Sequence, residues 1–269
     1  MVSDVYSVWS DLIEAICQLF LAALFLSFTY PGSSMKTITG IGNEFKEAAG
    51  DYLYLLERRY PQGSIIKMIG DRYRLNSVER SVLYRGISAR KDAERRSARL
   101  LDTACLADRE LHIDGFNVLI TIGSYLNGNL VFISNDNIMR DASEIHSKVI
   151  HSQLIDKAIL LLFSAIESIK PAGLFFYLDE PVSHSGEICH KIKELIDHYH
   201  YPGSASTFKS PDFQLKSLES GVAATSDTGI IDNCKVPVAD LPKFVLSYHF
   251  RKEFLDIRNF ISDDLPGFE

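Results

Sequence analysis

The sequence of 269 residues contains few of the residues that build disulfide frameworks or zinc sites. Its four cysteines are scattered and lack the Cys-x-x-Cys spacing, and its eight histidines form no His-Glu-x-x-His pattern. This pattern argues against a structural zinc site and is typical of proteins in a reducing compartment, so we expect a cytoplasmic protein. No internal repeat or low-complexity tract is found.

Long apolar runs are also scarce. The run over residues 15–28 is shorter than the roughly 20 residues that a membrane span usually needs. No lysine or arginine precedes Lys36, which argues against a secretory signal. Three interpretations of residues 1–34 stay open: an amphipathic or packed helix, a weak membrane anchor, or translated sequence upstream of a start at Met35. We favour the last, because the composition changes abruptly there, and we expect no stable membrane association.

Charge is distributed unevenly along the chain. The net charge of −7 argues against a general nucleic-acid coat. However, residues 36–105 contain 14 lysines and arginines against 9 acidic residues, whereas residues 106–269 contain 14 against 23. The sequence therefore predicts a basic domain over residues 35–105 that precedes an acidic domain over residues 106–269.

The basic domain has helical periodicity from residue 43 to about residue 102. A Pro-Gln-Gly break after Tyr60 separates two helices, and Asn76 and Glu79 have the spacing of a capping box. Arginines such as Arg72 and Arg85 lie on or near the outer face. A solvated helix surface is the ordinary explanation of such charge, and the alternative is contact with nucleic-acid phosphates, for which arginine supplies bidentate donors.

After Leu111, short apolar runs alternate with helical segments, which predicts an α/β fold with a doubly wound, mostly parallel sheet. The predicted helices cover residues 118–126, 151–169 and 186–199, and the predicted strands lie within residues 111–114, 129–133, 174–178 and 222–226. Residues 202–206 and 210–212 are interpreted as loops. Apolar residues at positions 244, 245, 246 and 250 fit either the core or an interface, so the sequence leaves a homodimer open.

Each predicted strand leads into carboxylates. Asp114 and Gly115 stand where the first strand turns into a helix; the other strands lead to Asp141, Asp179 and Asp227. The carboxyl ends of strands form the ligand crevice of an open α/β sheet, and oxygen donors suit Mg²⁺ or Mn²⁺. One such aspartate is more often a turn former or helix cap. The set favours a cation site, because asparagine or serine would serve those local roles equally well.

Two serines near the start of a predicted helix, Ser183 and Ser185, belong to the segment Ser-His-Ser-Gly. Their hydroxyls and the free amides of the first helical turn could hold a phosphate. The alternative is that one of them is simply the N-cap of that helix.

The chain also resembles a known family, on the motifs Ile-Asp-Gly-Phe-Asn (113–117), Asn-Asp-(3)-Arg-Asp (135–141), Leu-Asp-Glu-Pro-Val-Ser-His-Ser-Gly (178–186) and Thr-Ser-Asp-(4)-Asp (225–232). These motifs, with the basic helices, resemble a widespread uncharacterised prokaryotic family in which a small all-helical domain precedes a PIN-like domain. The resemblance covers roughly residues 43–239. It implies membership of the PIN and NYN superfamily, whose domains are mostly metal-dependent ribonucleases.

The resemblance also implies roles for individual residues. Asp114 matches the first-strand aspartate of the superfamily, and Asp227 matches the aspartate of its Thr-x-Asp element. Asp141 and Asp179 are implied as further ligands, and Asp232 as an outer carboxylate of the metal site. Asn117 and Arg140 join Ser183, Ser185, Arg72 and Arg85 as expected substrate-binding residues. The chain departs from the common pattern in lacking a clear helical glutamate, for which Glu144 is the nearest candidate.

We therefore expect a nuclease that uses Mg²⁺ or Mn²⁺ to hydrolyse RNA, with DNA as the less favoured substrate. Asp114, Asp141, Asp179 and Asp227 are its expected catalytic residues. The alternative is a non-catalytic RNA-binding or regulatory module. An aspartyl phosphatase is disfavoured because Phe116 occupies the position of its second aspartate, and a dinucleotide enzyme is disfavoured because no Gly-x-Gly-x-x-Gly follows the first strand.

Overall fold

The computed structural model describes residues 41–42, 44–143, 153–251 and 253–261. The described residues belong to a single compact unit, Gly40–Glu269. The interpretations of residues 1–34 and the candidate Glu144 lie outside the described part of the chain.

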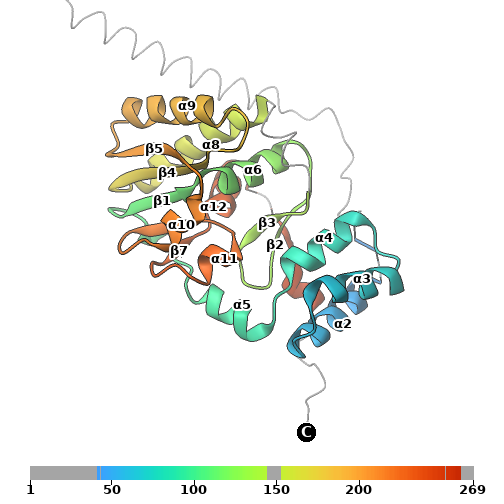
Figure 1. Cartoon of the computed structure of the whole chain (residues 1–269). Helices are drawn as coiled ribbons and strands as arrows, with labels where there is room; N and C mark the ends of the chain where they lie inside the picture. The colour runs from blue at the N-terminus through green and yellow to red at the C-terminus, as the bar shows by residue number, and fades with distance from the viewer. Residues whose placement is uncertain (1–40, 43, 144–152, 252, 262–269) are drawn as a thin grey trace, which may run out of the picture. The chain divides into compact units, whose positions relative to one another are not determined.

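The amino-terminal segment is helical (Figure 1), and its first three helices share an apolar core with Phe132 and Leu255 of a small second sheet, while the fourth helix contributes no residue to this core. These helices are α2 (Phe45–Glu57), α3 (Gln62–Arg72), α4 (Ser77–Gly86) and α5 (Arg90–Ser97). The predicted capping box is confirmed at the start of α4, where Asn76 Oδ1 accepts from Glu79 N at 2.9 Å and Glu79 Oε2 accepts from Asn76 N at 2.9 Å. Two orphan amides of the first turn are thereby satisfied.

A five-stranded parallel sheet follows, in the order β5-β4-β1-β6-β7. Its strands are β1 (Glu110–Asp114), β4 (Gly173–Asp179), β5 (Gly203–Phe208), β6 (Val222–Ala224) and β7 (Val238–Ala239). The chain moves outward from β1 through β4 to β5 and then crosses to β6 on the other side of β1. The boundary between β1 and β6 is therefore a topological switch point, where α/β sheets bind ligands.

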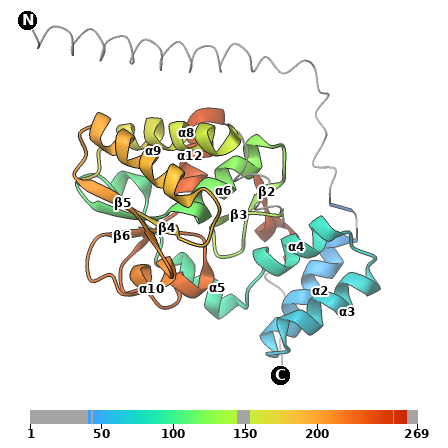
Figure 2. The same ribbon diagram turned by 45° about the horizontal axis from the view of Figure 1, so that its top comes forward.

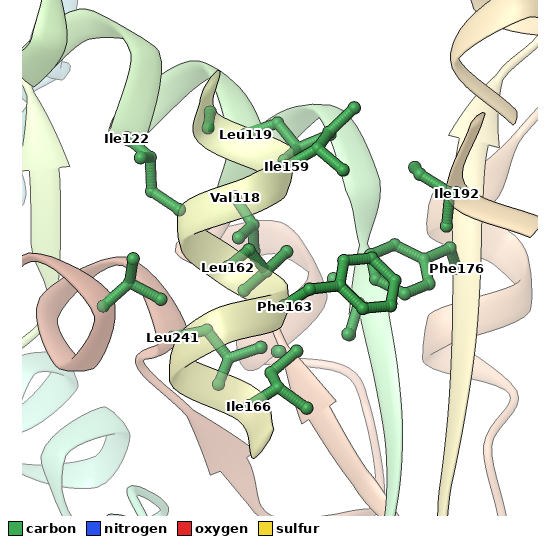
Figure 3. Close-up of a cluster of buried hydrophobic side chains, with 14 of the residues drawn as sticks. Val118, Leu119, Ile122, Ile159, Leu162, Phe163, Ile166, Phe176, Ile192 and Leu241 are labelled. Carbon is green, nitrogen blue, oxygen red and sulfur yellow. The ribbon is translucent and has the colours of Figure 1, made fainter. Parts of the chain in front are cut away.

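Helices cover both faces of this sheet (Figures 1 and 2). One face carries α6 (Gly115–Leu126), α8 (Gln153–Ile169), α9 (Ser185–His198) and α12 (Leu241–Phe250), and the other carries the short helices α10 (Pro211–Lys216) and α11 (Thr228–Ile231). Leu119, Phe163 and Phe176 meet in the larger core between the sheet and the first group (Figure 3). The alternation of strands and helices after Leu111 thus gives the α/β class that the sequence predicts.

The three predicted helices are confirmed with small shifts: α6 begins at Gly115, α8 ends at Ile169 as predicted, and α9 runs from Ser185 to His198. For α12 the structure decides between the core and the interface. Val245 and Leu246 are fully buried in the main core, so an interface role for these two residues is wrong. Phe244 and Phe250 also pack against that core.

The run over residues 129–133 was expected in the main sheet, and this prediction is wrong. Its strand β2 (Val131–Ile133) belongs to a second, mixed sheet with β3 (Met139–Asp141) and β8 (Leu255–Asp256), in the order β3-β2-β8. The physical reason is a hairpin: β2 pairs antiparallel with β3, and Asn137 adopts the left-handed φ of 66° in the turn. A 3-10 turn, η1 (Thr103–Cys105), precedes the main sheet, and η2 (Ile257–Phe260) follows the small one.

The expected loop over residues 202–206 is also wrong, because Gly203 starts the edge strand β5. A Cβ on Gly203 would lie 1.9 Å from the carbonyl oxygen of Leu174, so only glycine allows this close pairing with β4. The predicted strand 222–226 is shorter than expected, since β6 ends at Ala224. Across the described part of the chain, no helix is both long and apolar enough to cross a membrane.

Candidate functional site

Asp114 is the last residue of β1 and stands at the switch point of the sheet. Its side chain is only 7% exposed, and its Oδ2 accepts a hydrogen bond from Thr225 Oγ1 at 2.7 Å. The next residue, Gly115, lies so close to β4 that a Cβ would meet Leu178 Cδ2 at 2.6 Å. Glycine therefore lets α6 begin directly after the aspartate.

Three more aspartates lie at the carboxyl ends of neighbouring strands. Asp179 ends β4, Asp212 lies in the first turn of α10 after β5, and Asp227 is the N-cap of α11 after β6. We call Asp114, Asp179, Asp212 and Asp227 the edge cluster. Apart from Lys216 at 3.5 Å from Asp212, no cationic partner of these carboxylates is found among the residues that the structure describes.

The edge cluster is electrostatically strained. Burial raises the pKa of Asp114 to about 7, the hydrogen bond from Thr225 opposes this rise, and the carboxylates of the other three aspartates add to it. Burial also raises the pKa of Asp179, again with a contribution from Asp212. Like charges near a desolvated carboxylate favour its protonated form, so a bound cation would relieve the strain.

Local hydrogen bonds fix the loop that carries Asp227. Thr225 Oγ1 donates to Asp114 and accepts from Asp227 N at 3.1 Å. One hydroxyl thus links the two aspartates that match the aspartates of the PIN and NYN superfamily. Asn117 Oδ1 accepts from both Ser226 N at 2.8 Å and Ser226 Oγ at 2.9 Å. Asn117 thus ties the loop after β6 to the start of α6.

The donor set of the edge cluster is suited to a hard divalent cation, because every side-chain donor is an oxygen. Among the described residues, however, no group of three or more His, Cys, Asp or Glu side chains is already placed to hold a metal ion. A cation bound here would therefore have to draw the carboxylates together or use waters and substrate oxygens as ligands.

Two predicted ligands are engaged elsewhere. Asp141 pairs with Arg85 Nη1 at 3.0 Å and accepts from two serine hydroxyls. Asp232 accepts from Arg96 Nε at 2.8 Å and Nη2 at 2.7 Å, and also from Arg95 Nη2 at 3.1 Å. The hydrogen bonds from Arg96 are the main reason why the pKa of Asp232 is lowered. The carboxylates of Asp141 and Asp232 therefore bind arginines of the helical segment.

Arg140 is similarly engaged. It forms a bidentate pair with the fully buried Asp136, with Nη1 to Oδ1 at 2.7 Å and Nη2 to Oδ2 at 2.8 Å. Arg96 Nη1 lies 3.7 Å from the same carboxylate. Burial by itself would raise the pKa of Asp136, but these arginines hold it below its usual value. We call Asp136, Asp141 and Asp232 the bridging aspartates.

A cavity of about 450 Å³ lies between the helical segment and the loops of the edge cluster. Of the predicted site residues, the structure brings together around it Asn117, Asp227, Asp141, Arg85 and Arg140. Asp227 thus belongs to the edge cluster and also lines the cavity.

The other predicted substrate-binding residues lie apart from this lining. Arg72 ends α3, with its side chain 69% exposed and Nε 3.9 Å from Asp51 Oδ2. Ser185 is buried and donates to the carbonyl oxygen of Glu180 at 3.2 Å, and Ser183 is exposed in the preceding loop. The N-cap of α9 is His184, without a side-chain capping bond, so the N-cap interpretation of either serine is wrong.

Sequence reasoning missed Asp212 and the two arginines that hold Asp232. The signal for Asp212 was an aspartate directly after Pro211, at the start of a helix. This signal indicates a site residue only when residues 203–208 are assigned as a strand, because that assignment places α10 at the carboxyl edge of the sheet.

Comparisons with known proteins identify two families. The description "Domain of unknown function (DUF5616)" matches residues 103–244, and "Protein of unknown function (DUF434)" matches residues 44–99. The "Uncharacterized protein MJ0935" of Methanocaldococcus jannaschii is 30% identical over 208 residues, which cover 77% of this chain and 99% of that protein. No solved structure matches. Neither family description names a PIN-like domain, so the PIN-like resemblance stays a prediction.

Proposed function

Because the chain belongs to the DUF5616 family, whose description names no reaction, we propose its function from its own site: metal-dependent hydrolysis of phosphodiester bonds in RNA at the edge cluster. One observation carries the proposal. A buried carboxylate, Asp114, stands at the switch point of a parallel sheet among three other carboxylates that raise its pKa. Perturbed carboxylates in such a position are typical of functional sites.

In this proposal Asp114 and Asp227 hold Mg²⁺ or Mn²⁺, with Asp179 and Asp212 beside them. When bound, such an ion polarises the scissile phosphoryl group and lowers the pKa of a water molecule, so that hydroxide is available at neutral pH. Through its hydroxyl, Thr225 positions the carboxylate of Asp114 and the backbone of Asp227, and Asn117 holds the loop after β6 in place. The PIN-like resemblance supports this assignment of Asp114 and Asp227.

RNA is the proposed partner because the helical segment is rich in arginine. Exposed arginines such as Arg72 are proposed to contact phosphates, which fix a nucleic-acid backbone without reading its sequence. Arg95 and Arg96 have a different role, since both are paired with Asp232.

A second function, a non-catalytic RNA-binding module, is favoured by one observation. Within the described ranges, no group of three or more potential ligands is already assembled for a metal. Such a module would keep the fold and the RNA contacts without turnover.

Cleavage of labelled RNA and DNA by the full chain separates the two functions. The panel contains single strands, hairpins and duplexes, each with Mn²⁺, Mg²⁺ or EDTA. We expect cutting of RNA that needs the metal and disappears in Asp114→Asn and in Asp227→Asn. The control is Asp197→Asn, which removes an exposed carboxylate of α9 and should cut like the wild type. Intact substrates together with metal-independent RNA binding in all variants would overturn the nuclease and support the module.

A further inference from the structure

The cavity of about 450 Å³ is built by two parts of the chain that are distant in sequence. Gln62 of α3 and Tyr84 of α4 line it from the helical segment. Asn117, Asp227 and Thr228 line it from the carboxyl edge of the sheet. Its volume is within the range of about 300–1,000 Å³ that is usual for small-molecule sites. A ligand in this cavity would touch the helical segment and the loop of Asp227 at the same time.

Three guanidinium groups border the cavity, but each is already paired with a carboxylate. Arg85 is paired with Asp141, and the side chains at positions 96 and 140 are paired with bridging aspartates in bidentate geometry. A free phosphate would have to displace a buried or partly buried carboxylate from its hydrogen-bonded partner, which is unfavourable. The cavity is therefore better suited to a neutral ligand than to an isolated anion.

The lining offers hydrogen-bonding groups and includes a partly exposed tyrosine. Asn117 Oδ1 is occupied by Ser226, while its Nδ2 has no acceptor among the described residues. Thr228 adds a hydroxyl group to the lining, and Tyr84 is 48% exposed, so part of its side chain is available for contact. A planar ligand with polar edges would use both kinds of group.

We propose that this cavity is a subsite for one nucleoside unit, the sugar and base of a single nucleotide, whose adjoining phosphodiester lies toward Asp227. This inference rests on the proposed function and deepens it. The sugar and base are neutral, carry donors and acceptors, and present a face for stacking, as the lining requires. The helices α3 and α4 then form a wall of the substrate site, and their residues select the base.

The test is saturation-transfer NMR on the full chain with adenosine, guanosine, cytidine and uridine, and inorganic phosphate is the anionic probe, followed by the broadening of its phosphorus-31 line. We expect transfer to at least one nucleoside and weaker binding of phosphate. Gln62→Trp should weaken the nucleoside at least roughly tenfold, because an indole at this position fills the cavity from the helical side. The matched control is Ser64→Trp, which places the same indole on an exposed position of α3 outside the lining.

Tyr84→Ala provides a second variant that removes contact area without filling space, and it should weaken the same nucleoside. Circular dichroism melting identifies any variant that fails to fold. The subsite would be overturned if none of the four nucleosides showed transfer. It would also be overturned if the Gln62→Trp and Ser64→Trp proteins bound the nucleoside equally well.

The two proposals can fail separately. Asp114→Asn should retain nucleoside binding while losing cleavage. Cleavage that is lost in Asp114→Asn, without nucleoside binding in the wild type, would remove the subsite and leave the nuclease. Nucleoside binding that is sensitive to Gln62→Trp in a protein that cuts nothing would remove the nuclease and leave a nucleoside site.

Discussion

The edge cluster and the bridging aspartates use one residue type in opposite electrostatic settings. Each bridging aspartate is paired with at least one arginine, and the pKa values of Asp136 and Asp232 are lowered. No arginine pairs with the edge cluster among the described residues, and the pKa values of Asp114 and Asp179 are raised. This difference shows that an aspartate at a strand end indicates a functional site only when its hydrogen-bond and ion-pair partners are known. Carboxylates that lower the free energy of unfolding are better candidates for function than carboxylates that raise it.

The largest expected effect comes from breaking a bridging pair. Arg140→Met leaves the fully buried Asp136 without its bidentate partner, so we expect the free energy of unfolding to fall by about 3–5 kcal/mol in urea titrations. The control is Arg258→Met, which removes the exposed partner of the half-buried Asp256, and the expected loss is about 1 kcal/mol. Equal losses in the two variants would contradict the structural role assigned to Arg140.

Replacing an aspartate of the edge cluster should have the opposite effect and raise the free energy of unfolding. The native pKa of Asp114 is about 7, above its unfolded value of 3.8, so the native state holds this proton more tightly. The wild type therefore loses stability as the pH rises from about 4 to about 7, and the loss persists above pH 7. Asparagine carries no such charge. In EDTA at about pH 8, Asp114→Asn should raise the free energy of unfolding by about 1–3 kcal/mol, and by less at about pH 5.

Asp197→Asn controls for the loss of an exposed carboxylate, and its free energy of unfolding should stay close to that of the wild type. If Asp114→Asn is less stable than the wild type at about pH 8, the carboxylate is not strained and the contrast between the two sets of aspartates fails.

The smallest expected change in stability sharpens the same contrast within the edge cluster. Asp227 caps α11 by accepting from Ile230 N at 2.9 Å, and asparagine caps a helix about as well. Asp227→Asn should therefore keep the free energy of unfolding within ~0.5 kcal/mol of the wild type while cleavage is lost. A larger fall in stability would show that the charge of Asp227 has a structural role.

Much of the fold could be predicted from apolar periodicity. The helices α6, α8 and α9 and the strands β1 and β4 are strongly periodic or continuously apolar, and they form the centre of the main core. The capping box at Asn76 was predicted because both partners lie within four residues of sequence. Local signals of this kind need no knowledge of the rest of the chain.

Features that depend on distant partners could not be predicted. The strand β5 is rich in small polar residues, so its sequence alone predicts a loop, and only its pairing with β4 identifies it as a strand. Asp141 ends β3 and Asp232 is the C-cap of α11, and their partners Arg85 and Arg96 lie on helices far earlier in the chain. No local pattern distinguishes an aspartate that binds an arginine from one that faces a substrate.

The pairing of Arg96 with Asp232 also has a consequence for the order of events during synthesis. The two residues are separated by 136 positions, so a ribosome that adds about 5–20 residues per second needs about 7–27 s to travel from one to the other. During that interval Asp136 and Asp141 are already made, but Asp232, the bidentate partner of Arg96, does not yet exist. The end of α11 therefore completes the pairing of α5, and a chain that stops before Asp232 releases this helix with Arg96 still lacking its bidentate carboxylate.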